Sequence, residues 1–180
     1  MSLLKISEGA DPNYLATVVK VPKIQEHPNA NKLEIVEIFG NTIVVGKDSY
    51  TEGETVVYFP VESALCPKFL SWANLFDKPE LNADQLTKGY FQSKGRVRAV
   101  ALRGIPSQGF LFKVNLLAEY LEVDSTQFKV GETFDTVGNV QLSTKYVKGT
   151  EKLRKNNSLV LILRHLGNGF ITFTFNTLQP

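Results

Sequence analysis

Short apolar runs alternate with turn-forming residues through the first third of the chain, and each run has the length of a β-strand. Residues 14–24 are rich in β-branched side chains, and residues 33–38 alternate apolar and charged positions. Residues 42–46 and 55–59 are again β-branched. These compositions favour strands, and the glycine and asparagine at 40–41 suit the tight turn of a hairpin. Strands at this spacing predict a small antiparallel sandwich or barrel.

The pattern changes between residues 62 and 92. Aromatic and leucine side chains at 69–76 have the spacing of a short helix or of an aromatic-rich loop. Residues 77–92 are polar, include Gly89, and predict an excursion between strands, where functional residues often lie. Trp72 has two interpretations, since it could stack on a base or pack among neighbouring apolar side chains.

The segment 94–112 carries the most distinctive chemistry of the chain. Its first half alternates as a strand does, so Arg96 and Arg98 are predicted to share one face, with Arg103 at the strand's end. A turn containing glycine, proline and serine then leads to a second apolar segment. Guanidinium groups beside a polar turn suit phosphate, to which they donate paired hydrogen bonds. The alternative is a solvent-exposed strand face on which arginine serves solubility.

After this segment the sequence predicts one short helix and then loses its periodicity. Residues 114–121 carry an apolar stripe at helical spacing, and residues 128–137 indicate a turn and a short strand. From residue 145 the chain is basic and unpatterned, which is typical of a linker. Residues 159–180 hold two β-prone segments that could pair as a hairpin, although an isolated hairpin is marginal in water.

Composition supports a folded domain with an uneven charge distribution. The 180 residues are 43% hydrophobic and 11% aromatic, which is enough for a core. Residues 84–113 carry 6 basic and 1 acidic group, and residues 145–180 the same numbers, whereas residues 1–66 carry 5 basic and 9 acidic groups. Positive charge concentrated in a central stretch and a tail favours a polyanion surface.

Few residues are suited to metal or redox chemistry. Cys66 is the single cysteine, so an internal disulfide and a cysteine-rich zinc site are excluded, and we expect it to be a small apolar residue. His27 could act as a ligand or base, or could hydrogen-bond the backbone to hold its loop. The sequence contains no secretory signal and no apolar run long enough to span a membrane, so we expect a cytoplasmic protein without a membrane partner.

Four blocks of the sequence point to a family. They are H-P-N-A-N-K-L-E-I-V at 27–36, V-V-G-K at 44–47, G-E-T-V-V-Y at 53–58 and L-R-G-I-P-S-Q-G-F at 102–110. Together they resemble the N-terminal module of bacterial and phage RNA ligases that place an OB-like domain ahead of an adenylyltransferase domain. The first block also resembles the tRNA-binding OB domains of some synthetases, so a free-standing tRNA-binding domain is an alternative.

The resemblance implies a fold and a division of labour. The expected fold is mainly β, a small antiparallel OB-like barrel over residues 12–144 with one or two short helices and a loop excursion, followed by a basic linker and a non-homologous tail at 145–180. The implied role is to engage RNA at a nick or end. In such ligases a lysine further along the chain takes AMP from ATP. The segment Lys148-Gly-Thr-Glu-Lys152 does not match that motif.

We therefore expect a truncated or interrupted ligase that is inactive alone. It would need no cofactor in this chain, with ATP and Mg required only if an adenylyltransferase domain is supplied. The expected partner is RNA or a nicked RNA-containing duplex. A further alternative is a protein-docking module that binds a separately encoded catalytic domain through Phe69, Trp72 and the helix at 114–121.

The RNA contacts are assigned to the basic and polar residues of these blocks. Lysine and arginine would neutralise phosphates, while serine and glutamine would hydrogen-bond the backbone or sugar, including a 2′-hydroxyl. The alternative for the Ser107-Gln108-Gly109 turn is that its side chains satisfy backbone groups of the barrel. The predicted nucleic-acid-binding residues are Lys32, Lys47, Lys94, Arg96, Arg98, Arg103, Ser107 and Gln108.

Overall fold

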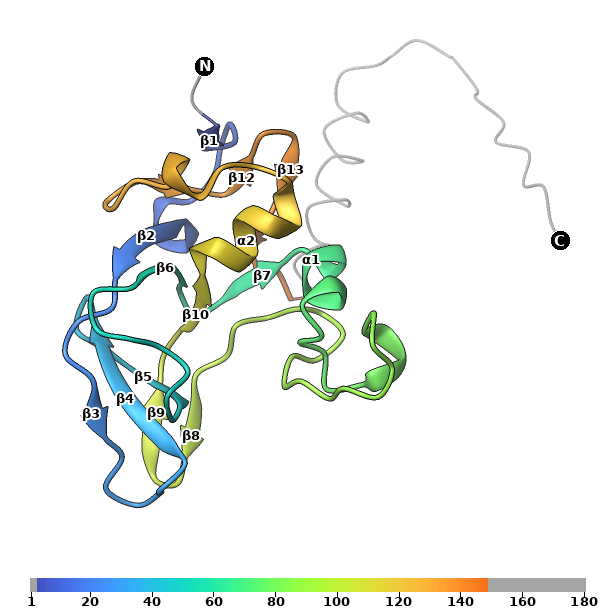
Figure 1. The fold of residues 1–180 in the computed structure, drawn as a ribbon. Coiled ribbons are helices and arrows are strands. Elements are labelled where there is room, and N and C mark those ends of the chain that lie inside the picture. Colours follow the sequence, from blue (N-terminus) through green and yellow to red (C-terminus); the bar gives the residue numbers. More distant parts are fainter. Residues whose placement is uncertain (1–2, 149–180) are drawn as a thin grey trace, which may run out of the picture. The chain divides into compact units, whose positions relative to one another are not determined.

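The computed structural model describes residues 3–148, and the fold is mainly β, as predicted. The predictions for the basic linker and tail at 145–180 lie, beyond Lys148, outside the described residues. The strands of the described part form five small antiparallel sheets that are not hydrogen-bonded into one closed barrel. Figure 1 shows these sheets around the two helices.

The central sheet is four-stranded, with the order β10-β6-β2-β11. Val18 pairs with Val57, and Leu111 with Tyr58. Because this sheet packs on both faces, its strands are nearly continuous apolar runs rather than alternating ones. Its strands are β2 (Ala16–Lys20), β6 (Thr55–Phe59), β10 (Phe110–Lys113) and β11 (Thr133–Phe134).

The second sheet is the predicted hairpin with one added strand. Its register pairs Leu33 with Gly46 and Ile38 with Asn41, so the turn lies at Phe39 and Gly40, one residue before the Gly40-Asn41 turn that the sequence predicted, and Asn41 is already part of the strand. Both turn residues have positive φ, 53° and 76°, as a two-residue hairpin turn requires. The strands are β3 (Gln25–Glu26), β4 (Leu33–Ile38) and β5 (Asn41–Gly46).

Three smaller sheets complete the β structure. One of them is three-stranded and pairs the first described residues with a later hairpin; its strands are β1 (Leu4–Lys5), β12 (Thr136–Val137) and β13 (Val140–Gln141). Another is two-stranded and consists of β7 (Ser63–Leu65) and β14 (Ser143–Lys145). The third is a short hairpin of β8 (Val100–Leu102) and β9 (Ile105–Ser107). The strand expected from Arg96 onward is therefore shorter than predicted, since only an isolated bridge from Arg96 to Ala64 precedes it.

The helices are short, and the longer one lies where it was predicted. The α-helices are α1 (Pro67–Trp72) and α2 (Val114–Leu121), and the 3₁₀ turns are η1 (Pro12–Tyr14), η2 (Pro79–Leu81) and η3 (Ser125–Gln127). Helix α2 buries Val114, Leu117 and Ala118. The polar excursion expected at 77–92 follows α1 and returns to the body at Phe91, which bridges Phe76.

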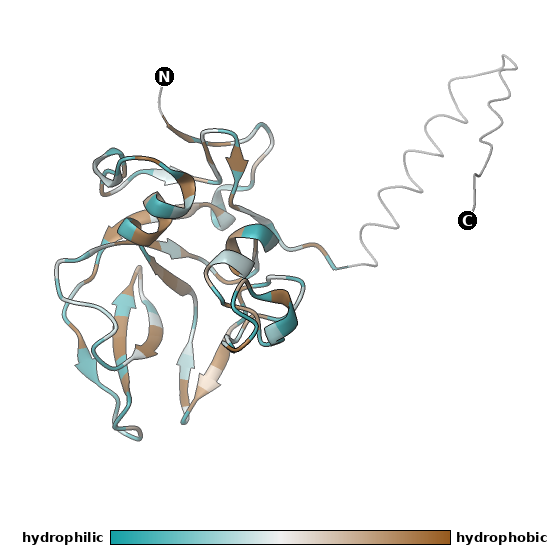
Figure 2. Ribbon diagram, turned by 45° about the vertical axis from the view of Figure 1, so that its right-hand side comes forward, coloured by the Kyte–Doolittle hydropathy of each residue, from teal (hydrophilic) through white to brown (hydrophobic). Residues whose placement is uncertain are grey.

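Two hydrophobic clusters fill the interior, one on each face of the central sheet. Val18 and Val57 point into an aromatic-rich cluster with both helices. Their neighbours Val19 and Val56 point into an aliphatic cluster under the β3–β4–β5 sheet. In Figure 2 the brown segments of the central strands mark their hydrophobic residues. The second cluster supports the β4–β5 hairpin, beside which the candidate site lies.

Candidate nucleic-acid interface

The β8–β9 hairpin is fixed to β5 by the residues that follow its turn. The Ser107 hydroxyl accepts a hydrogen bond from the Val44 backbone N–H at 3.0 Å, and the Gln108 N–H donates to the Thr42 carbonyl at 2.7 Å. Ser107 is only 4% exposed, so its side chain has the backbone-satisfying role that the sequence left as an alternative. The Gln108 side chain is exposed and remains available to a ligand.

The H-P-N-A block clamps the tip of the same hairpin. His27 is buried, its Nε2 lies 3.1 Å from the Leu102 carbonyl oxygen, and its Nδ1 accepts from the Asn29 N–H at 3.1 Å. Because Nδ1 accepts, the ring proton is on Nε2, which donates to Leu102. The Asn29 side-chain amide donates to the Arg103 carbonyl at 3.1 Å. The prediction that His27 holds its loop through backbone hydrogen bonds is confirmed.

This clamp holds Arg103 in an unusual backbone conformation at the turn. Arg103 has a φ of 49° and Gly104 one of 89°, so both central residues are left-handed, although arginine lacks glycine's tolerance for this region. Such strain persists when the surroundings impose it, and it concentrates at functional positions. Here the Asn29 contact and the β8–β9 pairing impose it. The side chain of Arg103 is exposed at the tip.

Lys32 and Lys47 lie together at the open end of the β4–β5 hairpin. The Lys47 N–H donates to the Lys32 carbonyl at 2.9 Å, and both side chains are exposed. The loop that ends at Lys32 begins at His27, which contacts the Arg103 hairpin. Residues from distant blocks of the sequence thus reach one part of the fold, although an acidic groove lined by Glu26, Glu34, Asp48 and Glu52 lies beside Lys47.

Arg96 and Arg98 flank buried Val97 but have different surroundings. Arg96 is half-buried, forms an ion pair with Glu62 and lies 4.7 Å from the ring centroid of Tyr146. The hydrogen bond that the Arg96 guanidinium donates to the Glu62 carboxylate raises the pKa of Arg96 further above its usual value. Arg98 is exposed. Arg96 thereby stabilises the region where the chain leaves the domain, whereas Arg98 is open to a ligand.

The exposed cations of this region are not neutralised by carboxylates. The ion pairs within residues 3–148 involve Arg96, Lys113 and Lys145. Among the described residues, none is formed by Lys94, Arg98 or Arg103, and all three are exposed. They are therefore the strongest candidates among the predicted residues for contact with phosphate.

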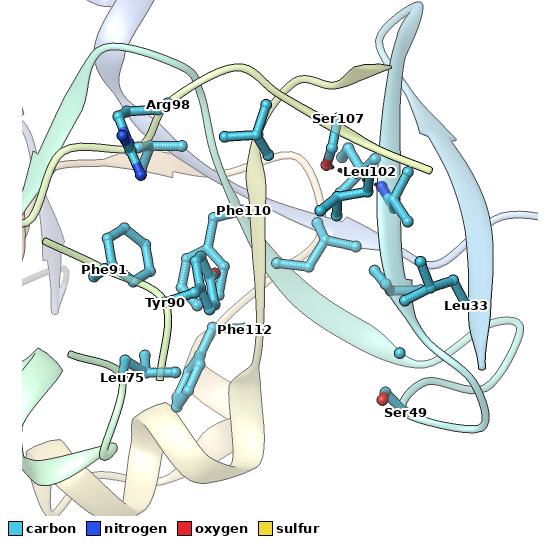
Figure 3. A pocket seen from close by; sticks show the side chains of 18 of the residues that line it. Leu33, Ser49, Leu75, Tyr90, Phe91, Arg98, Leu102, Ser107, Phe110 and Phe112 are labelled. Carbon is cyan, nitrogen blue, oxygen red and sulfur yellow. Dashed lines mark hydrogen bonds between the residues drawn. The ribbon is translucent and has the colours of Figure 1, made fainter. Parts of the chain in front are cut away.

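Beside the hairpin lies a cavity of about 570 Å³. Figure 3 shows its aromatic end, where Tyr90, Phe91 and Phe110 come together, and Arg98 on the same side of the cavity as Phe91. Leu33 and Ser49 line the opposite end, and Leu102 and Ser107 bring the hairpin into the wall. The sequence prediction missed this cavity. The signal that could have found it is an aromatic dipeptide, Tyr90-Phe91, within an otherwise polar excursion.

A second tyrosine lines the cavity from the β5 side. The Tyr50 hydroxyl donates to the Leu111 carbonyl at 2.7 Å. Burial, with a further contribution from Glu54, raises the pKa of Tyr50 well above its usual value. Tyr50 is therefore a neutral hydrogen-bonding group at neutral pH.

The excursion is held closed by one buried amide and one glycine. Asn82 accepts from the Phe76 N–H at 2.9 Å and donates to the carbonyls of Phe76 and Thr87 at 3.0 and 2.8 Å. The N–H groups of Tyr90 and Phe91 both donate to the Leu75 carbonyl, at 2.9 and 2.8 Å. These bonds bring the aromatic pair to the cavity.

At Gly89 the excursion approaches Leu75 too closely for any other residue. A Cβ at this position would lie 2.2 Å from the Leu75 carbonyl carbon. Glycine is therefore required here by backbone contact, and the close approach is what allows Tyr90 and Phe91 to reach Leu75.

The aromatic residues considered for protein docking are engaged in packing. Phe69 is fully buried, with its ring centroid 4.9 Å from that of Phe112. Trp72 is 37% exposed and lies 5.3 Å from the Tyr120 ring centroid. Phe69 is thus unavailable to a partner, and Trp72 has the packing role that the sequence offered as one of two interpretations. Cys66, at the start of α1, is half-buried and unpaired with another cysteine.

Two searches of the described residues were negative. Within residues 3–148, no cluster of three or more histidine, cysteine or acidic side chains is arranged to hold a metal ion. No helix in this part of the chain combines the length and apolar character needed to cross a lipid bilayer.

Comparisons with known proteins define the class. A family model described as an OB-fold domain matches residues 15–114, which is more than half of the chain, so the chain belongs to this OB-fold domain family. A search of curated proteins finds no match.

Solved structures of an RNA ligase from Naegleria gruberi are similar in fold to this chain. A mutant of that ligase with AMP and Mn is 22% identical over 75% of this chain and 36% of its own, with a TM-score of 0.50. An apo mutant is 21% identical over 82% of this chain and 37% of its own, with a TM-score of 0.49. At 22% identity and a TM-score of 0.50 the likeness shows the fold alone, and the chain spans little more than a third of the ligase's length.

Proposed function

We propose that this chain is the RNA-binding OB module of an RNA ligase and that it engages RNA at a nick or an end. The observation that carries the proposal is the group of exposed cations on and before the β8–β9 hairpin, Lys94, Arg98 and Arg103, which form no ion pair within residues 3–148. When exposed lysine and arginine side chains of an OB fold have no carboxylate partner, they can contact phosphates, and these contacts dominate the affinity for nucleic acid.

The eight predicted site residues divide into contacting and supporting roles. Arg98, Arg103 and Lys94 bind phosphates, and Gln108 hydrogen-bonds the sugar–phosphate backbone, for which its exposed amide has both a donor and an acceptor. Arg96 and Ser107 hold the structure through Glu62 and Val44. A 2′-hydroxyl facing Gln108 is what would distinguish RNA from DNA at this site.

Lys32 and Lys47 extend the cationic surface at its edge. Both are exposed, but Asp48 and Glu34 lie next to them, and the Glu34 carboxylate accepts from the Asp48 N–H at 3.2 Å. Carboxylates repel phosphate, so the acidic groove limits the RNA path on this side. We assign the two lysines a smaller part of the affinity than the hairpin arginines.

Nucleotidyl transfer is not assigned to residues 3–148. In this proposal the bond-forming chemistry, with ATP and Mg, belongs to the adenylyltransferase part of a ligase, in the same polypeptide or encoded separately. Incubation of the 180-residue chain with labelled ATP and Mg should give no protein–AMP adduct. A stable adduct would overturn this division of labour.

The test of RNA binding is a comparison of charge-matched variants. A fluorescent nicked duplex with RNA at the nick is titrated with the wild-type chain, with Arg98→Ala/Arg103→Ala, and with Lys23→Ala/Lys129→Ala. Lys23 and Lys129 are exposed and lie outside the proposed surface. The arginine variant should bind about tenfold or more weakly, because each lost phosphate contact reduces affinity, and the lysine control should bind nearly as wild type.

Two outcomes would contradict the proposal. Equal loss in both double variants would indicate general charge attraction rather than a site. Stronger binding of intact tRNA than of the nicked duplex would favour the alternative of a tRNA-binding domain, to which the H-P-N-A block also has a resemblance.

A further inference from the structure

The cavity beside the hairpin has the shape and chemistry of a ligand site. Its volume, about 570 Å³, lies in the range of small-molecule pockets. One end is built of aromatic rings, and Tyr90 is 55% exposed although it packs on Phe91 and Phe110 at centroid distances of 4.6 and 5.7 Å. A large aromatic ring that is supported from behind and open in front is a platform for another flat group.

We propose that this cavity receives a single unpaired base of the bound RNA, which stacks on Tyr90. The inference rests on the proposed function, since it assigns the binding of one nucleotide to a specific place next to the phosphate contacts. Bases stack on exposed aromatic side chains regardless of their identity, which suits a protein that engages different ends.

Charge at the cavity wall selects a nucleotide over an apolar protein segment. Arg96 and Arg98 both line the cavity, and Arg96 is paired with Glu62. Arg98 forms no ion pair within residues 3–148. If an apolar protein segment filled the cavity, the charge of Arg98 would lie beside it without a counter-charge. A nucleotide brings a phosphate for Arg98 together with a flat ring for Tyr90.

The remaining wall offers hydrogen bonds to the edge of a base. The Tyr50 hydroxyl uses its proton on the Leu111 carbonyl, so its oxygen can still accept. Ser49 is exposed, lines the end of the cavity opposite the aromatic rings, and can donate or accept. Every base has both donors and acceptors, whereas a hydrocarbon side chain would leave these groups without partners.

The site is preformed, which lowers the cost of binding. The double hydrogen bond of Tyr90 and Phe91 to the Leu75 carbonyl and the Asn82 bridge fix the aromatic pair. Little ordering of the protein is then needed when a base enters.

The experiment compares two nicked RNA-containing duplexes that differ in one group. Both carry a single unpaired nucleotide at the nick, which has a base in one duplex and is abasic in the other. The ratio of their dissociation constants isolates the base, because all phosphates are shared. For the full chain we expect the base to tighten binding roughly tenfold, the size of one stacking contact.

Variants at one position test where the base binds. Tyr90→Leu keeps an apolar side chain but no aromatic face, so the ratio should fall to about one while the abasic duplex binds as before. Tyr90→Phe should keep the ratio. Phe39→Ala removes another exposed aromatic, 67% exposed and outside the cavity, and should also keep it.

The outcomes separate this inference from the proposed function. Salt-dependent binding of both duplexes with equal affinity would overturn the base site and leave the RNA-binding module intact. A base preference that survives Tyr90→Leu but is lost in Phe39→Ala would place the base elsewhere. Failure of the wild-type chain to bind either duplex would overturn both proposals. If instead the wild-type chain binds a catalytic domain and Tyr90→Leu abolishes that binding, the cavity is a protein-docking site.

Discussion

The ring Nε2 of His27 lies 3.1 Å from the carbonyl oxygen of Leu102, although 75 residues separate them in the chain. This hydrogen bond joins the H-P-N-A block to the L-R-G-I-P-S-Q-G block. A loop histidine and an arginine-rich hairpin therefore form one structural unit. In the proposed function, His27 affects RNA binding only by positioning Arg103, whose carbonyl accepts a hydrogen bond from the side chain of the neighbouring Asn29.

The first prediction concerns His27→Ala. The change removes both ring nitrogens and leaves the Asn29 N–H and the Leu102 carbonyl without their partners, at a cost of about 1–3 kcal/mol in the free energy of unfolding. Urea denaturation of the two chains measures it. The control is Asn31→Ala, an exposed position in the same loop. Unchanged stability in His27→Ala would contradict the clamp.

The two arginines around Val97 are predicted to separate stability from binding. Arg96→Ala removes the partner of Glu62 and the contact with Tyr146, so it should lower the unfolding midpoint and change RNA affinity little. Arg98→Ala should lower affinity and leave the midpoint unchanged, since Arg98 forms no ion pair within residues 3–148. Denaturation and RNA titration on both variants decide it, and the reverse assignment would refute the proposed roles.

Gly89→Ala should open the excursion. A methyl group would lie 2.2 Å from the Leu75 carbonyl carbon, so the backbone must move apart and the hydrogen bonds to Tyr90 and Phe91 weaken. Limited proteolysis should then cut within residues 77–92 faster than in wild type. Ser93→Ala, at an exposed position directly after the excursion, is the control and should be cut as slowly as wild type.

Asn82→Ala tests the excursion at residues 77–92 through its buried amide. The variant loses three hydrogen bonds to backbone groups of the excursion. We expect a loss of about 2–3 kcal/mol, because buried backbone groups become unsatisfied. Calorimetric unfolding measures the change, and a variant as stable as wild type would show that the amide is dispensable.

The excursion should also be sensitive to acid. Hydrogen bonds from Thr87 first and the Leu86 N–H second lower the pKa of Asp84 below its ordinary value of 3.8. A folded-state pKa below the unfolded one stabilises the fold above pH 3.8, and this stabilisation is lost as the pH falls through the folded value. Asp84→Asn should flatten stability against pH below pH 3.8, and an unchanged profile would contradict the assignment.

Much of the fold was predictable because local patterns determine it. The β4–β5 hairpin, β6 and helix α2 lie at the predicted positions, where β-branched runs or an apolar stripe favour one structure. The single strand expected from Arg96 is divided because its two parts pair with different segments. Val97 exchanges backbone hydrogen bonds with residues 62–63 and Arg96 bridges Ala64, whereas Val100–Leu102 pairs with β9.

The residue types of the candidate site could be predicted from the sequence, but their contacts could not. Sequence placed arginines near a polar turn, but could not show that Glu62, 34 residues away, pairs with Arg96 or that Val44 needs the Ser107 hydroxyl. The cavity was missed because it depends on contacts among Leu75, Tyr90 and Phe110 that no spacing rule encodes. Long-range packing decides which of several suitable side chains reaches the surface.

The measurement that tests the central claim most directly is the salt dependence of RNA affinity. The slope of log affinity against log salt counts neutralised phosphates, at about 0.9 for each contact with a duplex. Titration of the nicked duplex at several salt concentrations should give a slope that is smaller by about two in Arg98→Ala/Arg103→Ala than in wild type. An identical slope in the two proteins would show that the hairpin arginines do not bind the RNA backbone.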